Sequence, residues 1–502
     1  MRGKKTAINT IMSLIQEFVG VVCGFILPRL ILSAFGSKYN GLTASISQFL
    51  SCAVLLRSGI GGATRAALYK PIARNDRAEI SSIVKATDIF MKKIGLILAG
   101  AIVAFAAIYP FLVQNEFDWF FTFTLFLIIG ASTFAESFFG VTYLIVLQAD
   151  QRLWVSSLMR SVCTILNTIF ASLLILHGSS IHVVKLATAT VYVAYPIVLG
   201  FYVRRKYQID RNAKPDNQAI SQRWDAFWQQ VAVFVMNNTD VMVLTAFTNL
   251  LEVSVYGVYN MIVSGIRSII VAFSNGLEAA FGNMIAKEER ALLKENVAII
   301  ELIVYGMSTI AYTCTALLVF DFIRIYTKVV TDVDYIRPAF AYMIIIANFF
   351  NNIRIPYQTV VNAAGHYKQT KKGAILEPVL NISLSILFVI KFGIVGVAIG
   401  TLAATVFRTI QYSVYMSKNI VIRSMSMTIH RCLTSFVESA VVILIVHFIK
   451  LDAATDYMTW ILNAIITGII SSIVVLTGSL IFYRQDVIRL LTKVRAIVKK
   501  RK

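Results

Sequence analysis

Charged residues are scarce in this chain of 502 residues, because only 15% are Asp, Glu, Lys or Arg whereas 57% are hydrophobic. A soluble protein keeps roughly a quarter of its residues charged. The hydrophobic residues occur in long blocks that short polar segments separate, which is not the pattern of one large soluble core. Such blocks are typical of repeated membrane spans and predict an all-α integral membrane protein.

Cysteine and histidine are also rare. The five cysteines stand alone, without a CxxC pair or a metal-ligand spacing, and the five histidines are dispersed. We therefore expect reduced thiols, no metal, no cofactor and no catalytic cluster. The run Ser58–Gly62 has the composition of a phosphate-binding loop but lacks the strand–turn–helix context and the following lysine. A close-packed or bendable part of a span is the better interpretation.

The hydrophobic blocks predict about fourteen transmembrane helices, since each span needs about 20 apolar residues. The first block is too long for a signal-peptide core and has no small-residue cleavage pattern after it, so we expect it to stay as the first span. Several blocks exceed the minimum, which predicts tilted or protruding helices. The spans lie near 8–35, 41–69, 87–113, 119–147, 155–177, 182–203, 226–249, 254–285, 297–325, 335–363, 373–391, 394–417, 432–450 and 457–483.

Acidic residues are outnumbered by basic ones, 26 against 47, and the formal net charge is +21. A basic chain can bind nucleic acid. Here, however, most Lys and Arg lie in alternate loops, and this asymmetry places both termini in the cytoplasm. The basic surface then faces the anionic inner leaflet, so we expect no nucleic-acid partner. The tail 484–502 is either a basic amphipathic helix on the membrane or a frayed charged end.

The chain repeats itself at an offset of about 214 residues. Ile72–Ala78 matches Ile285–Ala291, and Val146–Ala149 matches Val360–Ala363. Two further matches keep this order, so spans 1–6 repeat as spans 7–12 in parallel orientation. The expected organisation is two six-helix lobes around a central cavity, with two C-terminal helices. Its boundaries are an N-terminal lobe at 1–204, a cytoplasmic linker at 205–225, a C-terminal lobe at 226–418, spans 13 and 14 at 419–483, and the tail.

Arginines inside the spans are the strongest functional signal. A charge at mid-membrane depth is costly, so it usually faces a cavity or a partner. An arginine fork donates two hydrogen bonds to phosphate and cannot lose its proton, so a lumen lined by several would suit an anionic headgroup. The candidates for this substrate-binding cavity are Arg57, Arg267, Arg354, Arg29 and Arg65.

The alternative interpretation is that each intramembrane arginine pairs with a nearby acid and joins two helices. Arg160 and Arg408 lie closer to span ends and could also snorkel toward the headgroups.

Other polar residues share the spans. Asp240 in span 7 and Glu17 in span 1 could help to bind a coupling cation, although hydrogen bonding to a neighbouring helix is the likelier role on sequence grounds. Five polar residues of span 10 accompany Arg354 and could contact sugar hydroxyls. They are Asn348, Asn351, Asn352, Tyr357 and Gln358.

This architecture, with intramembrane arginines and matched cytoplasmic segments after spans 2 and 8, resembles the multidrug/oligosaccharidyl-lipid/polysaccharide exporter superfamily. Within it, the chain is most similar to the bacterial polysaccharide transporters, the flippases of lipid-linked oligosaccharides. The segment Phe35–Leu42, at the entry to span 2, is similar to the glycine-tyrosine-glycine pattern of that family. The resemblance covers essentially the whole chain.

The resemblance implies a transporter rather than an enzyme, placed as a multi-pass monomer in the bacterial cytoplasmic membrane and surrounded by its lipid. Its substrate would be an oligosaccharide on undecaprenyl pyrophosphate, carried from the inner to the outer leaflet by alternating access for cell-surface polysaccharide biosynthesis. Arg57, Arg267, Arg354 and Arg29 would bind the pyrophosphate. Family members use H⁺, Na⁺ or membrane potential for coupling.

Three alternatives stay open. A cation-coupled multidrug exporter shares the fold, but its cationic drugs call for acids and aromatics in the lumen. A lipid II flippase would bind the same pyrophosphate. A membrane glycan polymerase or ligase belongs to a different class and needs an active site, usually on a long outer loop, whereas every predicted outer loop here is short.

Overall fold

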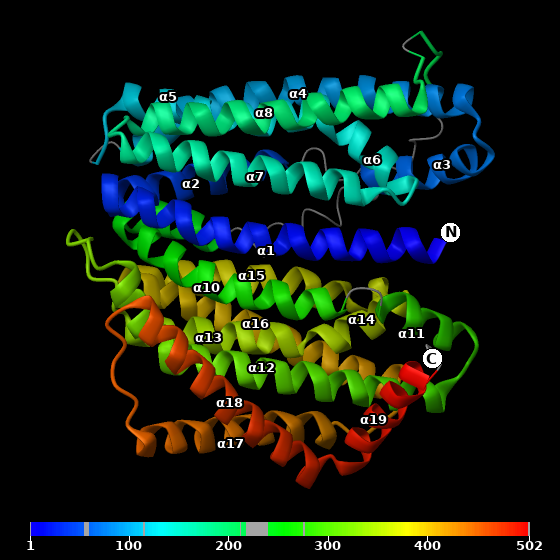
Figure 1. The fold of residues 1–502 in the computed structure, drawn as a ribbon, viewed down its shortest axis with the longest axis vertical. Helices are drawn as coiled ribbons and strands as arrows, with labels where there is room; N and C mark the ends of the chain where they lie inside the picture. Colours follow the sequence, from blue (N-terminus) through cyan, green and yellow to red (C-terminus); the bar gives the residue numbers. More distant parts are fainter. Residues whose placement is uncertain are drawn as a thin grey trace. The chain divides into compact units, whose positions relative to one another are not determined.

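The computed structural model describes residues 2–54, 60–113, 116–210, 212–216, 239–274 and 277–499, which form helices and connecting turns with no strand among them (Figure 1). The predicted all-α class is confirmed. The chain divides into two compact units, Met1–Gly257 and Val258–Lys502.

Eleven helices of the described part are long and apolar enough to cross a membrane. Each overlaps one of the predicted spans, because the long apolar window that predicts a span in the sequence forms a helix in the structure. The total of fourteen stays a prediction. The eleven segments are Ile11–Phe35, Arg77–Leu112, Trp119–Ala149, Leu153–Leu176, Ile181–Tyr207, Leu250–Val271, Arg290–Tyr326, Lys368–Phe392, Ile394–Asn419, Ser426–Ile449 and Tyr457–Phe482.

The other three predicted spans differ from a single long helix or are only partly described. The segment 41–69 contains α2 (Ser37–Val54) and α3 (Ile60–Arg74), with residues 55–59 outside the described part. The segment 226–249 is described only from residue 239 onward. Over 335–363 the single helix expected from the sequence is wrong, because the structure has α13 (Pro338–Ile353) and α14 (Ile355–Ala363).

Proline accounts for the break between α13 and α14. Pro356 lies near the start of α14, and its ring would clash with the carbonyl of the residue four positions earlier while offering no N–H to it. The helix therefore ends at Ile353, and Arg354 occupies the junction. Over the predicted span 254–285 the described residues form α10 (Leu250–Ser274) and α11 (Leu277–Ala286), with residues 275–276 outside the described part.

In the first unit, long helices lie side by side (Figure 1). Helix α1 (Arg2–Phe35) packs along α7 (Leu153–Leu176), and α8 (Ile181–Tyr207) lies against both α7 and α5 (Trp119–Ala135). Helix α4 (Arg77–Leu112) packs against α5. Its 36 residues extend about 54 Å, which exceeds the hydrocarbon thickness and agrees with the expected protrusion.

A π-helical turn, Glu136–Gly140, interrupts the fourth predicted span between α5 and α6 (Val141–Ala149). The extra residue of a π turn rotates the side chains that follow it, and such turns are frequent at functional sites. Gly140 permits the close approach to α8, because a Cβ there would lie 2.7 Å from the Cβ of Pro196.

In the second unit, α12 (Arg290–Tyr326) contacts α13, α17 (Ser426–Ile449) and α18 (Tyr457–Phe482). Helices α15 (Tyr367–Phe392) and α16 (Ile394–Asn419) form a closely packed pair. A Cβ at position 396 or 400 of α16 would overlap atoms of α15, so glycine four residues apart sets this approach.

Corresponding elements recur at the predicted offset. Helices α6 and α14 both have nine residues, and their bounds differ by 214 positions at each end. The π turn before α6 ends at Gly140, and the break before α14 falls at Arg354, again 214 positions later. The repeat of spans 1–6 as spans 7–12 stays a prediction.

The tail is helical. Of the two sequence-based expectations for residues 484–502, the structure shows a helix, α19 (Arg484–Lys499). Ile488 and Leu491 are exposed on it, whereas Asp486 is buried.

Candidate functional site

Arg354 lies at the junction of α13 and α14 and points toward α15. Its Nη1 pairs with the carboxylate of Glu377, and its Nη2 donates to Asn351 Oδ1 at 2.6 Å. The side chain of Arg354 is only 11% exposed. The predicted deep arginine is therefore buried, with one acid as its direct partner.

Arg408 of α16 binds the other side of the same carboxylate. Its Nε lies 3.3 Å from Glu377 Oε2, and its Nη1 donates to the Thr370 carbonyl at 3.1 Å. The guanidinium stacks on the Tyr412 ring at 4.0 Å, and the side chain is 4% exposed. The expectation that Arg408 could snorkel to the membrane surface is therefore wrong, because its charge is held inside the helix bundle.

Arg267 of α10 adds a third cation to this group. It is half-buried and within electrostatic reach of Arg354, Glu377 and Tyr312. Within the described part of the chain, its guanidinium makes neither an ion pair nor a hydrogen bond. We call Arg267, Arg354, Arg408 and Glu377 the arginine cluster. The cluster has three cations and one carboxylate, so it carries two uncompensated positive charges.

The three asparagines of α13 differ in their hydrogen-bond partners. Asn351 accepts from Arg354, and the fully buried Asn352 donates to Tyr312 OH at 2.7 Å. The Oδ1 of Asn352 has no hydrogen-bond partner in the described part of the chain. Asn348 donates to the Ile344 carbonyl of its own helix at 2.9 Å.

The two remaining predicted sugar contacts follow the break. Tyr357 is completely buried, and its hydroxyl lies 2.8 Å from that of Tyr305. Gln358 is half-buried on α14. The structure therefore brings Asn351 to the arginine cluster, whereas Asn352 contacts Tyr312 and Tyr357 is part of the packing between α14 and α12.

The other predicted arginines belong to the first unit. Arg65 of α3 donates from Nη1 to Gln148 Oε1 of α6 at 3.3 Å. Arg29 is half-buried in α1, one residue after Pro28. Arg57 lies outside the described residues.

The two predicted coupling acids have different surroundings. Asp240 is half-buried and accepts a hydrogen bond from Tyr256 OH of α10 at 3.0 Å, which is the hydrogen bond to a neighbouring helix that the sequence offered as an alternative to cation binding. Glu17 is exposed on α1 and has no ion pair among the described residues.

A second buried charge network holds the tail helix in place. Glu301 of α12 is fully buried and pairs with Arg423 and Arg431, whose side chains are 3% and 1% exposed. Arg431 Nη2 in turn contacts Asp486 Oδ2 of α19 at 2.7 Å. This network, the tail anchor, joins three helices of the second unit and accounts for the burial of Asp486.

Sequence reasoning missed Glu377 and assigned no function to Arg408. Glu377 stands four residues inside the apolar block 373–391, which made it look like the edge of a span. The helix in fact begins at Tyr367, so Glu377 lies ten residues within it. An acid followed by Pro378 inside a helix was the available signal.

No family model and no curated protein matches the sequence. Solved structures do match. One described as lipid II flippase MurJ in an inward closed conformation has a TM-score of 0.70 at 17% identity, over 95% of this chain and 99% of that chain.

Multidrug transporters match as well. An inward-facing multidrug resistance MATE family transporter of the MOP superfamily has a TM-score of 0.60 at 12% identity, over 84% of this chain and 99% of that one. The Vibrio cholerae MATE transporter VcmN in its bent form has a TM-score of 0.55 at 14% identity, over 83% and 97%. The chain has the fold of these transporters. With the eleven apolar spans of its described part, it is a multi-pass membrane protein, and the all-α transporter fold expected from the resemblance is confirmed, whereas the fourteen spans and the repeat layout stay predictions.

Proposed function

We propose that this protein is a flippase that moves undecaprenyl-pyrophosphate-linked oligosaccharide from the inner to the outer leaflet of the bacterial cytoplasmic membrane. The observation that carries the proposal is the arginine cluster, in which two guanidinium groups pair with one carboxylate and a third lies within electrostatic reach of it. A diphosphate supplies the negative charge that this group lacks. The fold shared with a lipid II flippase supports the same class of substrate.

The residues of the cluster have separate roles in this mechanism. Glu377 holds Arg354 and Arg408 in fixed positions. The guanidinium of Arg267 has no ion-pair partner among the described residues, so it can bind the diphosphate directly. The pyrophosphate binds first to Arg267 and then competes with Glu377 for Arg354. Because the surroundings are apolar, each charge-assisted hydrogen bond is stronger than it would be in water. The prenyl chain stays in the lipid throughout.

The sugars lie next to the diphosphate and need hydrogen-bond partners. Asn352 Oδ1 is buried without a partner in the described part, and Asn351 already binds Arg354. These two amides are our candidates for the first sugar. Asn348, Tyr357 and Gln358 remain weaker candidates, as do Arg29, Arg57 and Arg65 for the phosphate.

Transport proceeds by alternating access of a central cavity between the two predicted lobes, in a monomer with both termini in the cytoplasm. Coupling to H⁺, Na⁺ or the membrane potential is part of the proposal, with Asp240 and Glu17 as the candidate acids. No enzymatic step is needed, because the substrate crosses the membrane without a change in covalent structure.

Lipid II is the second candidate substrate, favoured by the likeness to the flippase structure over 95% of the chain. It presents the same diphosphate and differs in the sugars. A lipophilic drug cation fits less well, since the arginine cluster would repel it.

The test is a flipping assay in liposomes that contain the full chain. Three substrates are compared: a fluorescent undecaprenyl-pyrophosphate oligosaccharide, fluorescent lipid II and a lipophilic cation. Arg267→Ala is the most informative variant, because Arg267 has no ion pair to break among the residues that the structure describes. Arg354→Lys and Arg57→Ala test the other deep positions, and the control is Arg324→Ala, at a site whose side chain is 60% exposed.

We expect flipping of the oligosaccharide substrate and about a tenfold slower rate with Arg267→Ala, the effect of losing one hydrogen bond to a charged group. The control variant should match the wild type. Faster flipping of lipid II than of the oligosaccharide substrate would make lipid II the preferred substrate and leave the role of the arginine cluster unchanged. Export of the cation without flipping would overturn the function, and flipping unaffected by Arg267→Ala and Arg354→Lys would overturn the role of the cluster.

A further inference from the structure

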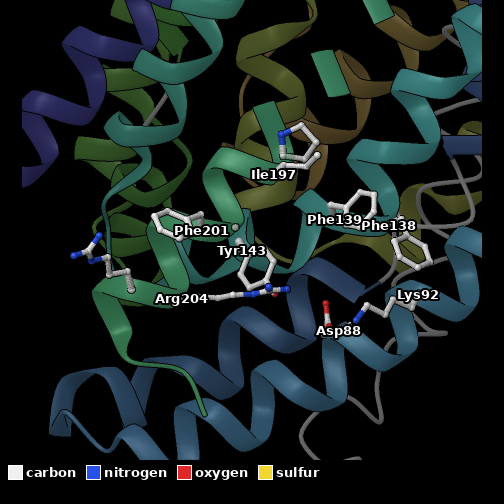
Figure 2. A pocket seen from close by; sticks show the side chains of 11 residues that line it. Asp88, Lys92, Phe138, Phe139, Tyr143, Ile197, Phe201 and Arg204 are labelled. Atoms are coloured by element: carbon white, nitrogen blue, oxygen red, sulfur yellow. Dashed lines mark hydrogen bonds and ion pairs between the residues drawn. The ribbon is translucent and has the colours of Figure 1, made fainter. Parts of the chain in front are cut away.

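The first unit contains a cavity of about 740 Å³ between α4, the π-helical turn with α6, and α8 (Figure 2). None of its residues belongs to the arginine cluster, which lies in the second unit. The walls are formed by aromatic and aliphatic side chains and by a few charged ones. The lining includes Asp88, Lys92, Phe139, Tyr143, Ile197, Phe201, Arg204 and Arg205.

Small residues and the π turn shape this cavity. Gly140 allows the turn to approach Pro196 of α8, and Gly200 allows α8 to approach the Tyr143 ring, where a Cβ would lie 3.0 Å from a ring carbon. The π turn also shifts the register of the side chains before α6, which places Phe138 and Phe139 on the wall opposite Ile197 and Phe201 (Figure 2).

The apolar wall is open to the surroundings. Ile197 is 51% exposed and Phe201 66% exposed, and both lie within a span of hydropathy high enough for a membrane helix. Apolar side chains exposed at this depth contact lipid, because water does not reach the hydrocarbon region. An acyl chain can therefore enter the cavity sideways.

The opposite edge of the cavity is polar and positively charged. Arg204 Nε donates to Tyr143 OH at 2.6 Å, and its guanidinium lies 4.9 Å from the ring centroid. Its two terminal nitrogens make no hydrogen bond in the described part of the chain. Lys92 Nζ lies 2.8 Å from Asp88 Oδ2, and Arg205 adds a third cation. Three cations against one acid leave two positive charges.

A smaller cavity of about 170 Å³ adjoins this edge and shares Asp88, Lys92, Tyr143 and Arg204 with the larger one. It adds Lys85 and Asp210, whose charges cancel. The whole site thus has a compact polar compartment beside a larger apolar one. This division matches the shape of a molecule with a charged head and a hydrocarbon chain.

We propose that this cavity binds an anionic phospholipid. The lipid phosphate lies against Lys92, Arg204 and Arg205, and one acyl chain lies against Ile197 and Phe201. Inorganic phosphate would satisfy the cations but leave the apolar compartment unfilled, and a neutral lipid would leave the two charges uncompensated. A pocket of several hundred Å³ with a mostly apolar lining is the usual size for a ligand of this kind. The inference holds whichever substrate the protein transports.

The position along the helices identifies the leaflet. Lys92 follows the basic segment at the start of α4, and Arg204 and Arg205 lie in the last turn of α8. Both ends are on the side that the distribution of Lys and Arg assigns to the cytoplasm. The lipid therefore comes from the inner leaflet, where anionic headgroups attract basic side chains.

The experiment is native mass spectrometry of the full chain, released from detergent after equilibration with equal amounts of phosphatidylglycerol and phosphatidylcholine of the same acyl chains. Arg204→Gln and Lys92→Ala remove cations from the site. Lys93→Ala is the matched control, because Lys93 is the next residue of α4, is exposed and does not line the cavity. Ile197→Trp fills the apolar compartment from an exposed position and leaves every charge in place.

We expect the wild type to retain phosphatidylglycerol in preference to phosphatidylcholine. Arg204→Gln and Lys92→Ala should each lower that preference about fivefold, the effect of one cation near an anionic headgroup. Ile197→Trp should reduce retention of both lipids, and Lys93→Ala should match the wild type. Equal retention of the two lipids by the wild type would overturn the proposal. So would displacement of the bound lipid by millimolar inorganic phosphate, or an equal effect of Lys93→Ala and Lys92→Ala.

Discussion

Glu377 is the residue on which the geometry of the arginine cluster depends. Its carboxylate contacts Arg354 with one oxygen and Arg408 with the other, and its side chain is 7% exposed. Two guanidinium groups would otherwise face each other in an apolar environment, where like charges repel strongly. The acid therefore allows several arginines to gather inside the membrane without unfolding the bundle.

We predict that Glu377→Gln destabilises the protein by about 3 to 5 kcal/mol, the range for removing one partner of a buried ion pair. Thermal unfolding in detergent measures the change. Glu289→Gln, at an exposed position before α12, is the control and should leave the transition unaltered. Adding Arg408→Gln to Glu377→Gln removes one of the stranded charges and should recover part of the loss. An unaltered transition in Glu377→Gln would contradict the structural role given to this acid.

Sequence reasoning identified about half of this cluster. Arg267 and Arg354 stand out because each lies deep in an apolar block, where an arginine is unusual. Glu377 stands four residues inside its block and Arg408 was interpreted as close to a span end, because hydropathy alone does not separate a span edge from a charge held in the interior. The pairing between them depends on how α15 packs on α16. The glycines of α16 determine this packing, and a single sequence does not show which helices are neighbours.

At the scale of elements, the break between α13 and α14 positions Arg354. We predict that Pro356→Ala raises the unfolding temperature and slows flipping. Alanine restores an N–H and removes a ring clash that costs about 3 kcal/mol within a helix. A straighter helix would change how Arg354 is presented to the diphosphate. Unfolding temperature and flipping rate, measured on the same preparation, test both parts, and a faster rate would show that the break does not serve transport.

The tail helix is a second element whose position rests on few side chains. Asp486 contacts Arg431, whose Nη1 has no partner in the described part, so the loss of this acid leaves a buried cation poorly compensated. We predict that Asp486→Asn releases α19 and speeds tryptic cleavage at Arg489 and Lys493 about tenfold, the effect of losing one hydrogen bond to a charged group.

The matched control for this prediction is Asp452→Asn, an acid in the exposed connection before α18. Cleavage of the tail in this variant should proceed at the wild-type rate. Slow cleavage in Asp486→Asn would mean that the apolar contacts of α19 hold it without the tail anchor.

At the scale of the whole molecule, the sequence was sufficient for the all-α class and for eleven of the spans. Each of these has a long apolar window, and crossing a bilayer as a helix demands little else. The segment 335–363 was harder. It contains Arg354 together with Pro356, and its break depends on local contacts that a hydropathy window averages away.

The orientation of the molecule is the prediction with the widest consequences, because it assigns the leaflet of both proposed sites. Most Lys and Arg lie in alternate connections, and moving these charges across the membrane is unfavourable. We therefore predict that a cysteine at position 206, in the last turn of α8, faces the cytoplasm, and that one at position 452, between α17 and α18, faces outward. Both positions are exposed.

The measurement uses Lys206→Cys and Asp452→Cys in a chain whose five natural cysteines are replaced by alanine. A membrane-impermeant maleimide should label position 452 in intact cells and position 206 only after permeabilisation. The reverse pattern would place the basic ends of α4 and α8 in the outer leaflet. The cavity beside Arg204 would then take its lipid from that side, and the direction of the proposed transport would have to be reversed with it.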